Sequence, residues 1–355
     1  MVYILLAILI FGILIGLHEL GHFAVAKACG VKVNEFSIGM GPLLFQKKKG
    51  ETDYSLRLFP IGGFCAMEGE DDESEDPRAL NHQPFWKQFL IIIAGAAMNF
   101  ITGLLILLCL YAGAAAFYTN EIVALNDGFP SAGEDGIMVG DEIFKINGER
   151  IYLRNDVATV LQYKSQGDTL ELVVLRDGKK LERTLHKQTY TDENGNEYRA
   201  FGFSYGNVVE ATPLLKLKYT WYNAIDYVRL VRMSLQMLIT GTAGVKDLSG
   251  PVGIVSTISE MGQETEAEAG FAAALENVLF FGAMIAVNLA VMNLLPLPAL
   301  DGGKILILIV DEIAMLLFKK KIPQKFEAVI NAVGFVALMG LMLFVTFNDV
   351  SKLVK

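Results

Sequence analysis

Four apolar stretches, each long enough to cross a membrane, constrain the fold of this chain more than any other feature. The first runs from residue 2 to about residue 27, and residues 1–16 carry no charged side chain. The other three cover residues 89–118, about 271–295 and 326–347. Because about 20 apolar residues in a helix cross the hydrocarbon core of a bilayer, we expect a helical membrane protein. A hydrophobic content of 53% agrees with this expectation.

The first apolar stretch contains two histidines and a glutamate, in the sequence His18-Glu19-Leu20-Gly21-His22. Positions i and i+4 of a helix share one face. Both imidazoles can therefore bind one Zn²⁺ while Glu19 reaches a water molecule beside it. Ionisable side chains are costly at membrane depth and usually have a function there. The sequence thus predicts zinc chemistry within the bilayer, with His18 and His22 as ligands.

The composition argues against several other classes of protein. A formal net charge of −9 gives no reason to expect nucleic acid binding. Three scattered cysteines are too few for a disulfide framework or a cysteine-rich metal site. The first apolar stretch also lacks the positively charged start of a signal peptide, so we expect it to be retained as a membrane span.

Lysines and arginines predict the orientation of the spans, because cytoplasmic loops are enriched in them. Eight lie within residues 27–87 and four within residues 319–325. Both loops should be cytoplasmic, which places both termini and the middle of the chain outside. Lys352 and Lys355 oppose this orientation weakly.

Residues 120–250 are less apolar and predict a small β-rich domain. Asn147-Gly148 and Asp177-Gly178 are typical of tight hairpin turns, and each predicts a β-hairpin, with a short helix between the two. A longer helical pattern begins after Pro213. It predicts a helix that either lies at the membrane interface or packs on the β-rich domain.

Catalytic zinc usually takes three protein ligands and one water, so the two histidines need a third partner. The other two histidines of the chain lie outside the predicted spans, which leaves a carboxylate. Asp301 is the strongest candidate, because it follows a proline-broken apolar stretch where a metal would compensate its charge. Glu276, Glu35 and Glu51 are weaker rivals, and capping of a helix is the alternative role of Asp301.

The same residues predict hydrolytic chemistry. Bound zinc lowers the pKa of water to roughly 7 and polarises a carbonyl. Glu19 can then accept the proton of the water and return it to a leaving amine. A buried carboxamide can stabilise the oxyanion, and Asn293 and Asn99 are the candidates. For either, a hydrogen bond between helices is an equally good interpretation.

Two apolar segments that contain glycine, residues 35–43 and 54–64, lie between the first and second spans. They predict strands, and an exposed strand edge can bind an unwound substrate as an added strand. Such backbone enters the membrane only where it lines a cavity. An ordinary cytoplasmic hairpin is the alternative.

Several motifs, spread over nearly the whole chain, resemble the site-2 protease family of intramembrane metalloproteases, in its bacterial RseP/RasP type. Besides residues 18–22, these motifs occupy residues 36–42, 60–64, 75–78, 95–100, 249–254 and 293–303. The resemblance implies that His18, His22 and Asp301 bind one zinc ion per chain. It implies that Glu19 is the catalytic base and that Asn293 holds the substrate or the oxyanion. Residues of the glycine-containing segments would form a membrane-re-entrant β element.

The resemblance also implies a fold class: a polytopic α-helical membrane protein of about four transmembrane helices, with a re-entrant β element and one inserted extracytoplasmic PDZ domain. The PDZ motifs are residues 130–132, 140–143 and 146–148. The implied parts are an N-terminal membrane part (1–118), the PDZ domain (119–188), a post-PDZ extracytoplasmic or interfacial segment (189–265) and a C-terminal membrane part (266–355).

Two positions depart from the family pattern. Ala96 stands where proline is frequent, and Lys304 stands where histidine or arginine is common. Neither is a proposed ligand, so the zinc prediction is unaffected.

Substrates of this family are typically single-pass membrane proteins already shortened by another protease, such as anti-sigma factors or remnant signal peptides. The expected function is therefore regulated intramembrane proteolysis in a bacterial cytoplasmic membrane, with the zinc site towards the cytoplasmic side. The PDZ domain would filter substrates by size or bind a new C-terminus. The oligomeric state is not predicted.

Two functions of other classes were weighed against proteolysis. A membrane scaffold with a PDZ domain would leave Glu19 between two histidines unexplained. A transporter with a helix broken at Pro296 and Pro298 would be expected to contain repeats, and the sequence shows no inverted repeat.

Overall fold

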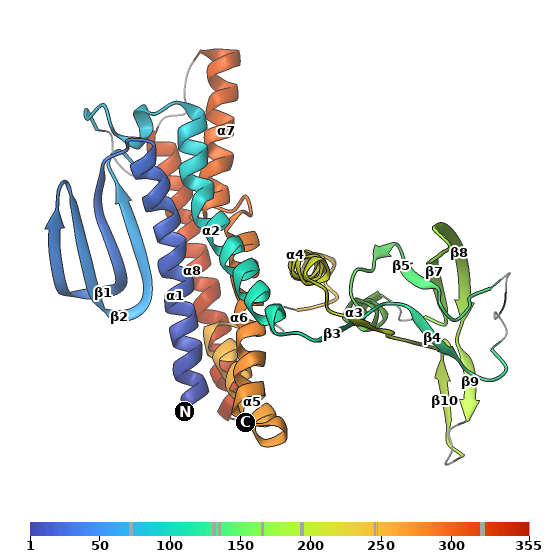
Figure 1. Cartoon of the computed structure of the whole chain (residues 1–355). Helices are drawn as coiled ribbons and strands as arrows, with labels where there is room; N and C mark the ends of the chain where they lie inside the picture. The colour runs from blue at the N-terminus through green and yellow to red at the C-terminus, as the bar shows by residue number, and fades with distance from the viewer. Residues whose placement is uncertain are drawn as a thin grey trace. The chain divides into compact units, whose positions relative to one another are not determined.

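The structure is a computed structural model of the 355-residue chain, and it describes most of the residues. Those left undescribed are residues 71–73, 130–132, 134–135, 165–166, 192–194, 245, 247, 320–323 and 355. The chain forms two compact units (Figure 1). The membrane unit comprises Met1–Leu110 and Tyr227–Lys355, and the middle unit comprises Tyr111–Asp226.

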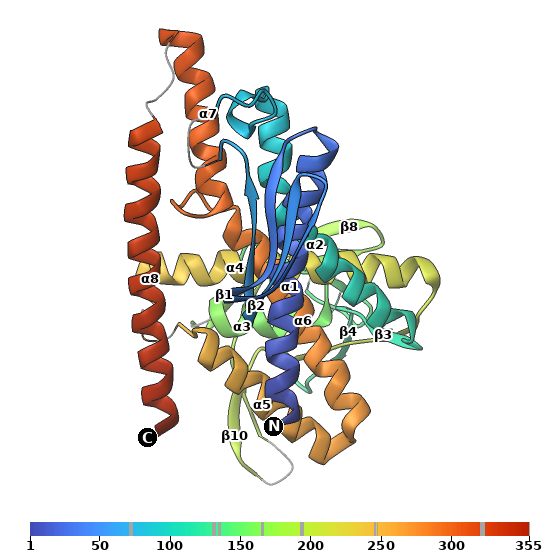
Figure 2. The ribbon, with the colours of Figure 1, turned by 90° about the vertical axis from the view of Figure 1, so that its left-hand side faces the viewer.

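Long apolar helices that run alongside one another make up the membrane unit (Figures 1 and 2). In the part of the chain that the structure describes, four helices are long and apolar enough to cross a membrane, as predicted. They are α1 (Val2–Ala28), α2 (Phe85–Ala112), α6 (Phe271–Asn293) and, within α8 (Gln324–Val354), the segment Ala328–Lys352.

Helix α5 (Pro251–Ala269) packs against α1, α6 and α8. Buried side chains of α1, α5 and α6 pack into one apolar cluster, with Tyr3, Ile258 and Ile285 among its members. Helix α8 stands at one side (Figure 2) and is tied to the start of α5 by Asp349. The carboxylate of Asp349 accepts the N–H groups of Gly250 at 2.9 Å and Gly253 at 2.8 Å. Free N–H groups at a helix start bind carboxylates well.

The second span ends earlier than the predicted residue 118. Helix α2 stops at Ala112, and β3 (Ala116–Tyr118) pairs instead with β12 (Val208–Glu210). The ring of Phe117 stacks on that of Tyr219 with centroids 4.1 Å apart. Residues 116–118 therefore pack in the middle unit and do not continue the helix. The apolar character of the stretch did not predict this end.

A non-helical segment follows α6, as the prolines predicted. Helix α6 ends at Asn293 and α7 (Asp301–Phe318) begins eight residues later along the chain. Ala299 in this segment has a positive φ of 68°. Gly302 and Gly303 are buried, and a Cβ on either would meet backbone atoms of the preceding segment. The two glycines thus let the start of α7 lie directly against the segment that follows α6.

Strands β1 (Val33–Lys49) and β2 (Thr52–Met67) form an antiparallel sheet beside α1 (Figure 1). Both strands bend, so that four segments pair in the order 43–49, 52–57, 33–38 and 63–67. Residues 63–67, here called the edge segment, form one border of this sheet as far as the structure describes it. Seven large apolar side chains of the sheet are 48–61% exposed: Ile38, Met40, Leu44, Phe45, Leu56, Leu58 and Phe59. This exposure is unusual for a hairpin in water.

The middle unit contains both predicted hairpins. Its largest sheet has the order β6-β5-β7-β8, made of β5 (Glu142–Ile146), β6 (Glu149–Arg150), β7 (Thr169–Arg176) and β8 (Lys179–His186). Helix α3 (Arg154–Lys164) separates the hairpins. At the first turn Asn147 and Gly148 have φ values of 45° and 81°, the left-handed pair that a type I′ turn requires.

Shorter strands complete the middle unit. Strand β4 (Ile122–Leu125) pairs with β11 (Phe203–Tyr205), and β9 (Gln188–Thr191) pairs with β10 (Glu197–Ala200). The helix expected after Pro213 is α4 (Pro213–Thr240), and its Tyr219 packs on Phe117 and Leu153 of this unit. The unit is longer than residues 119–188, and residues 130–132 of the proposed PDZ motifs lie outside the described part. Its identity as a PDZ domain stays a prediction.

A buried ion pair connects the loop before β5 to β7. The Asp141 side chain is 2% exposed and accepts hydrogen bonds from Arg176 Nε at 2.7 Å and Nη2 at 2.8 Å, and from the Met138 N–H at 2.8 Å. Burial alone would raise the pKa of Asp141. The hydrogen bonds and the charge of Arg176 outweigh it, so that this pKa lies below its ordinary value.

We expect Asp141→Asn to destabilise the middle unit by about 3 kcal/mol, because it removes the buried negative charge that pairs with Arg176. Since the folded pKa of Asp141 is depressed, its stabilisation is present above the unfolded pKa of about 3.9 and is lost as pH falls through the folded pKa. Hydrogen exchange of β5 and β7 amides in the full-length protein measures the opening free energy against pH. Equal values for variant and wild type at pH 7 would contradict the expectation.

Candidate metal centre

Helix α1 presents His18 and His22 one turn apart on its buried face, and the two residues are 9% and 8% exposed. The Nδ1 of His22 lies 2.8 Å from the Ile91 carbonyl oxygen of α2. A carbonyl can only accept a hydrogen bond, so Nδ1 carries the hydrogen, and in the neutral imidazole Nε2 then presents a lone pair. The hydrogen bond therefore aims the ligand nitrogen of His22 away from α2.

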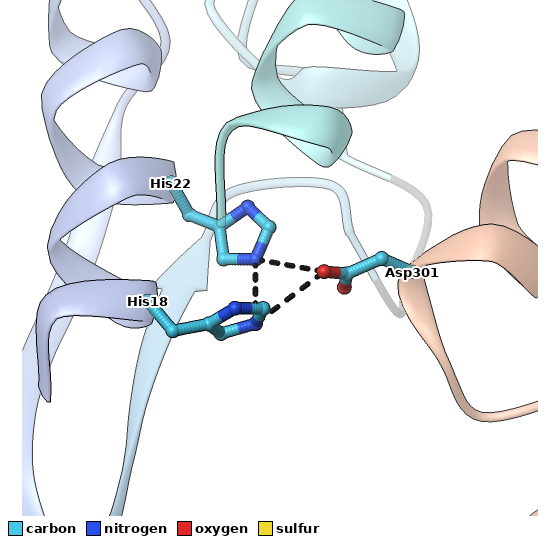
Figure 3. Close-up of side chains that lie close together, drawn as sticks. All are labelled: His18, His22 and Asp301. Carbon is cyan, nitrogen blue, oxygen red and sulfur yellow. Dashed lines mark hydrogen bonds and ion pairs between the residues drawn. The ribbon is translucent and has the colours of Figure 1, made fainter. Parts of the chain in front are cut away.

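Asp301, the first residue of α7, completes a triangle with the two imidazoles (Figure 3). Its Oδ2 lies 3.3 Å from His18 Nε2 and 3.4 Å from His22 Nε2, and the two Nε2 atoms are 3.3 Å apart. Among the described residues, these three form the one cluster of three or more His, Cys, Asp or Glu side chains with metal-ligand spacing. The structure thus brings together all three ligands predicted from the sequence.

The triangle fits a zinc ion. A tetrahedral ion with bonds of about 2.0–2.1 Å separates its ligand atoms by about 3.3–3.4 Å, which are the separations found between these three atoms. Asp301 Oδ2 is also buried without a hydrogen-bond donor, and a buried anionic oxygen needs a compensating cation. No side-chain capping bond is made at the start of α7, so the alternative capping role of Asp301 is not supported.

The rival carboxylates lie elsewhere. Glu35 accepts a hydrogen bond from Arg57 at 2.8 Å. Glu51 accepts hydrogen bonds from Lys27 at 2.8 Å and from Arg78 at 2.6 Å. Burial would raise the pKa of Glu35, but the hydrogen bond and charge of Arg57 outweigh it, so that this pKa is lowered. Lys27 and Arg78 likewise lower the pKa of Glu51. Glu276 is exposed on α6. Each rival is thus accounted for without a metal.

The two candidate amides both lie against His18. Asn99 Nδ2 and Asn293 Nδ2 are each 3.4 Å from His18 Nδ1. Asn99 is 1% exposed, and its Oδ1 has no hydrogen-bond partner. A half-turn of this amide would let Oδ1 accept a hydrogen from Nδ1, which leaves His18 Nε2 facing Asp301. Asn293, by contrast, is half-buried and also faces the neighbouring cavity.

A cavity of about 450 Å³, here called the site cavity, opens beside the triangle. Side chains of α1, the edge segment and α7 line it, and Glu19 is among them. A Cβ on Gly63 would lie 3.4 Å from Glu19 Cγ, so Glu19 lies next to the edge segment. The arrangement places a carboxylate, an amide and a strand edge around one space next to the three ligands.

Sequence reasoning assigned no role to Gly95, although the structure leaves no space for a side chain there. This glycine of α2 faces the imidazoles, and a Cβ there would meet His22 Nε2 and lie 2.6 Å from His18 Cε1. Gly21 of α1 similarly allows contact with the Ala94 backbone of α2. The signal in the sequence was a glycine within an apolar helix, which costs helix stability and so suggests close packing.

We expect Gly95→Ala to abolish stoichiometric metal binding, because the methyl group occupies the space of the two imidazoles. Gly16→Ala on α1 is the matched control, since a Cβ there has nothing within 4 Å. Metal content of the purified proteins, together with their thermal unfolding, checks this. Retention of one metal ion per chain by folded Gly95→Ala protein would show that the imidazoles lie elsewhere.

Comparisons with known proteins agree with this geometry. The model of peptidase family M50 matches residues 6–341. A protein of Clostridium perfringens that is named as a zinc metalloprotease is 41% identical over 349 residues, which cover 98% of each chain. The regulator of sigma-W protease RasP of Bacillus subtilis is 29% identical over 427 residues, covering 98% of this chain and 97% of the relative. The chain therefore belongs to peptidase family M50, the site-2 protease family, and is a zinc metalloendopeptidase.

Proposed function

We propose that this zinc metalloendopeptidase cleaves a peptide bond within the transmembrane segment of a single-pass membrane protein. The observation that carries the proposal is the position of the ligand triangle. His18 and His22 belong to a helix that is long and apolar enough to cross a membrane, and Asp301 reaches them from a break that follows another such helix. Buried ionisable residues at this depth are expected to serve catalysis.

His18, His22 and Asp301 would hold the zinc ion. When bound, zinc supplies a Lewis acid that polarises the substrate carbonyl and activates water. Glu19 would accept the proton of the attacking water and donate it to the leaving amine as the peptide bond breaks. Glu19 lines the site cavity together with the edge segment and the two histidines. Its carboxylate would therefore face the space where a peptide would lie.

Asn293 and Asn99 would divide two tasks. Asn293 lines the site cavity, so its amide can donate to the carbonyl oxygen as negative charge develops on it. Asn99 is buried away from the cavity and would orient His18. Of the two candidates for the oxyanion, this geometry favours Asn293.

The edge segment would bind the unwound substrate. A helical substrate hides its backbone, so a scissile bond becomes accessible only in an extended conformation. Unwinding breaks the backbone hydrogen bonds of the helix, and an extended peptide can replace them by pairing with a free strand edge. Residues 64–67 line the site cavity, and the exposed apolar side chains elsewhere in the sheet would face lipid. This supports a membrane-re-entrant β element rather than a hairpin in water.

We also propose a regulatory setting. One relative is named as the regulator of sigma-W protease RasP, which supports regulated intramembrane proteolysis of anti-sigma factors. Remnant signal peptides are the second substrate class that we propose. The substrate would arrive already shortened outside the membrane. The middle unit would be extracytoplasmic, like both termini, and would act as a PDZ domain that filters substrates by size or binds their new C-terminus.

We expect Glu19→Gln to lower cleavage by about 10²–10⁴-fold, because the amide cannot accept the proton of the water. The measurement is co-expression with a tagged, pre-shortened single-pass substrate, followed by mapping of the cleavage position. Zinc content separates the roles: Glu19→Gln should keep one ion per chain, whereas His22→Phe should lose both zinc and cleavage. Equal cleavage by wild type and Glu19→Gln would remove Glu19 from the mechanism.

A further inference from the structure

Pro298, three residues before the ligand Asp301, is packed between two helices. On one side, a Cβ on Gly303 of α7 would lie 3.1 Å from Pro298 Cα. On the other side, a Cβ on Gly334 of α8 would meet Pro298 Cβ and would lie 3.0 Å from its carbonyl carbon and 3.1 Å from its Cα. The two helices can therefore approach the proline this closely because each presents a glycine to it.

Resting on the zinc role proposed for Asp301, we infer that Gly334 is a positioning residue for the metal centre. It lets α8 support the non-helical segment at Pro298 and Ala299. This support holds Asp301 at the distance from the two histidines that a shared zinc ion requires.

A second residue of α8 contacts the same segment from the same side. Asn331 Oδ1 accepts the N–H of Ala299 at 3.5 Å, and residues three apart in a helix, such as Asn331 and Gly334, share a face. Ala299 has a left-handed φ of 68°, which a residue with a side chain adopts only where its surroundings hold it there. Asn331 and Gly334 thus constrain two consecutive residues of the segment that leads into Asp301.

Helix α8 is itself held near its other end. The carboxylate of Asp349 accepts two N–H groups at the start of α5, and the neighbouring Val345 is only 5% exposed. A methyl group at Gly334 would therefore displace Pro298 rather than the whole helix. Because Asp301 follows Pro298 by three residues, the displacement would reach the third ligand.

The ligand triangle tolerates little displacement. Asp301 Oδ2 lies 3.3 Å from His18 Nε2 and 3.4 Å from His22 Nε2, and zinc sites keep their bond lengths to within about 0.2 Å. A methyl group that overlaps Pro298 Cβ needs more space than this tolerance offers. The contact at Gly334 therefore bears on the affinity for the metal and not only on the packing of α8.

We expect Gly334→Ala to weaken zinc binding about tenfold, the lower end of the range found when groups around metal ligands are changed. Gly340→Ala is the matched control on the same helix, because a Cβ there has nothing within 4 Å. This control should bind zinc as the wild type does. The measurement is zinc competition against a chelating dye with purified full-length protein, together with the thermal unfolding temperature of each metal-free variant.

A double variant distinguishes positioning from a merely structural effect. If Gly334 acts through Asp301, the variant Gly334→Ala, Asp301→Ala should bind zinc no more weakly than Asp301→Ala alone, because two changes to one interaction do not add. A general loss of packing would instead add to the effect of Asp301→Ala.

Asn331 provides a second variant that adds no volume, for the case that Gly334→Ala does not fold. Asn331→Leu removes the acceptor of the Ala299 N–H and should weaken zinc binding. Asn331→Asp keeps an acceptor oxygen at the same place and should bind zinc more tightly than Asn331→Leu.

Wild-type zinc affinity of folded Gly334→Ala protein, or additive losses in the double variant, would overturn the inference. If Gly334→Ala does not fold, wild-type affinity of Asn331→Leu would overturn it. Because zinc binding is measured without a substrate, failure here is distinguishable from failure of the proposed proteolysis, which the Glu19→Gln comparison tests.

Discussion

The cost of placing ionisable side chains among apolar helices is the constraint on which the rest of this structure depends. His18, His22 and Asp301 lie within 3.4 Å of one another in a unit that contains four helices apolar enough to cross a membrane. Two imidazoles and one carboxylate become compatible with such surroundings when they share a cation. The surrounding features follow from this requirement: glycines that let helices approach, a carbonyl that orients one imidazole, and a helix break that delivers the carboxylate.

Much of this centre could be predicted from the sequence, because its first part is local. Two histidines four residues apart on a helix must share a face, whatever the remainder of the chain does. Asp301 could be predicted because a carboxylate that follows a proline break in an apolar stretch requires a cation to compensate its charge. The two hairpins of the middle unit were similarly predictable, since Asn147-Gly148 and Asp177-Gly178 adopt the positive φ values that tight turns require.

Other features depend on contacts between distant residues, which no local pattern encodes. The end of α2 at Ala112 follows from stacking of Phe117 on Tyr219, about a hundred residues away. The different roles proposed for Asn99 and Asn293 depend on which of the two amides faces the site cavity. Lys304 donates a hydrogen bond to Glu70, more than two hundred residues earlier. In the sequence, Lys304 was visible only as a departure from the family pattern.

Membership of a peptidase family argues against the two other functions considered, a membrane scaffold and a transporter. A scaffold would not require the carboxylate of Glu19 beside the ligand triangle, and a transporter would not require the triangle itself. The edge segment, the ligands and Glu19 instead surround one cavity, as expected for an enzyme that must hold an extended peptide next to a metal. The middle unit has its own core, which includes Ile143, Leu170 and Val174.

X-ray absorption at the zinc edge of the purified protein tests the central claim most directly. The account predicts only nitrogen and oxygen ligands at about 2.0–2.1 Å, and loss of this ordered shell in Asp301→Ala. Cys65 also lines the site cavity, which gives the measurement a definite alternative. A sulfur ligand at about 2.3 Å, or an unchanged spectrum in Asp301→Ala, would contradict the proposed centre.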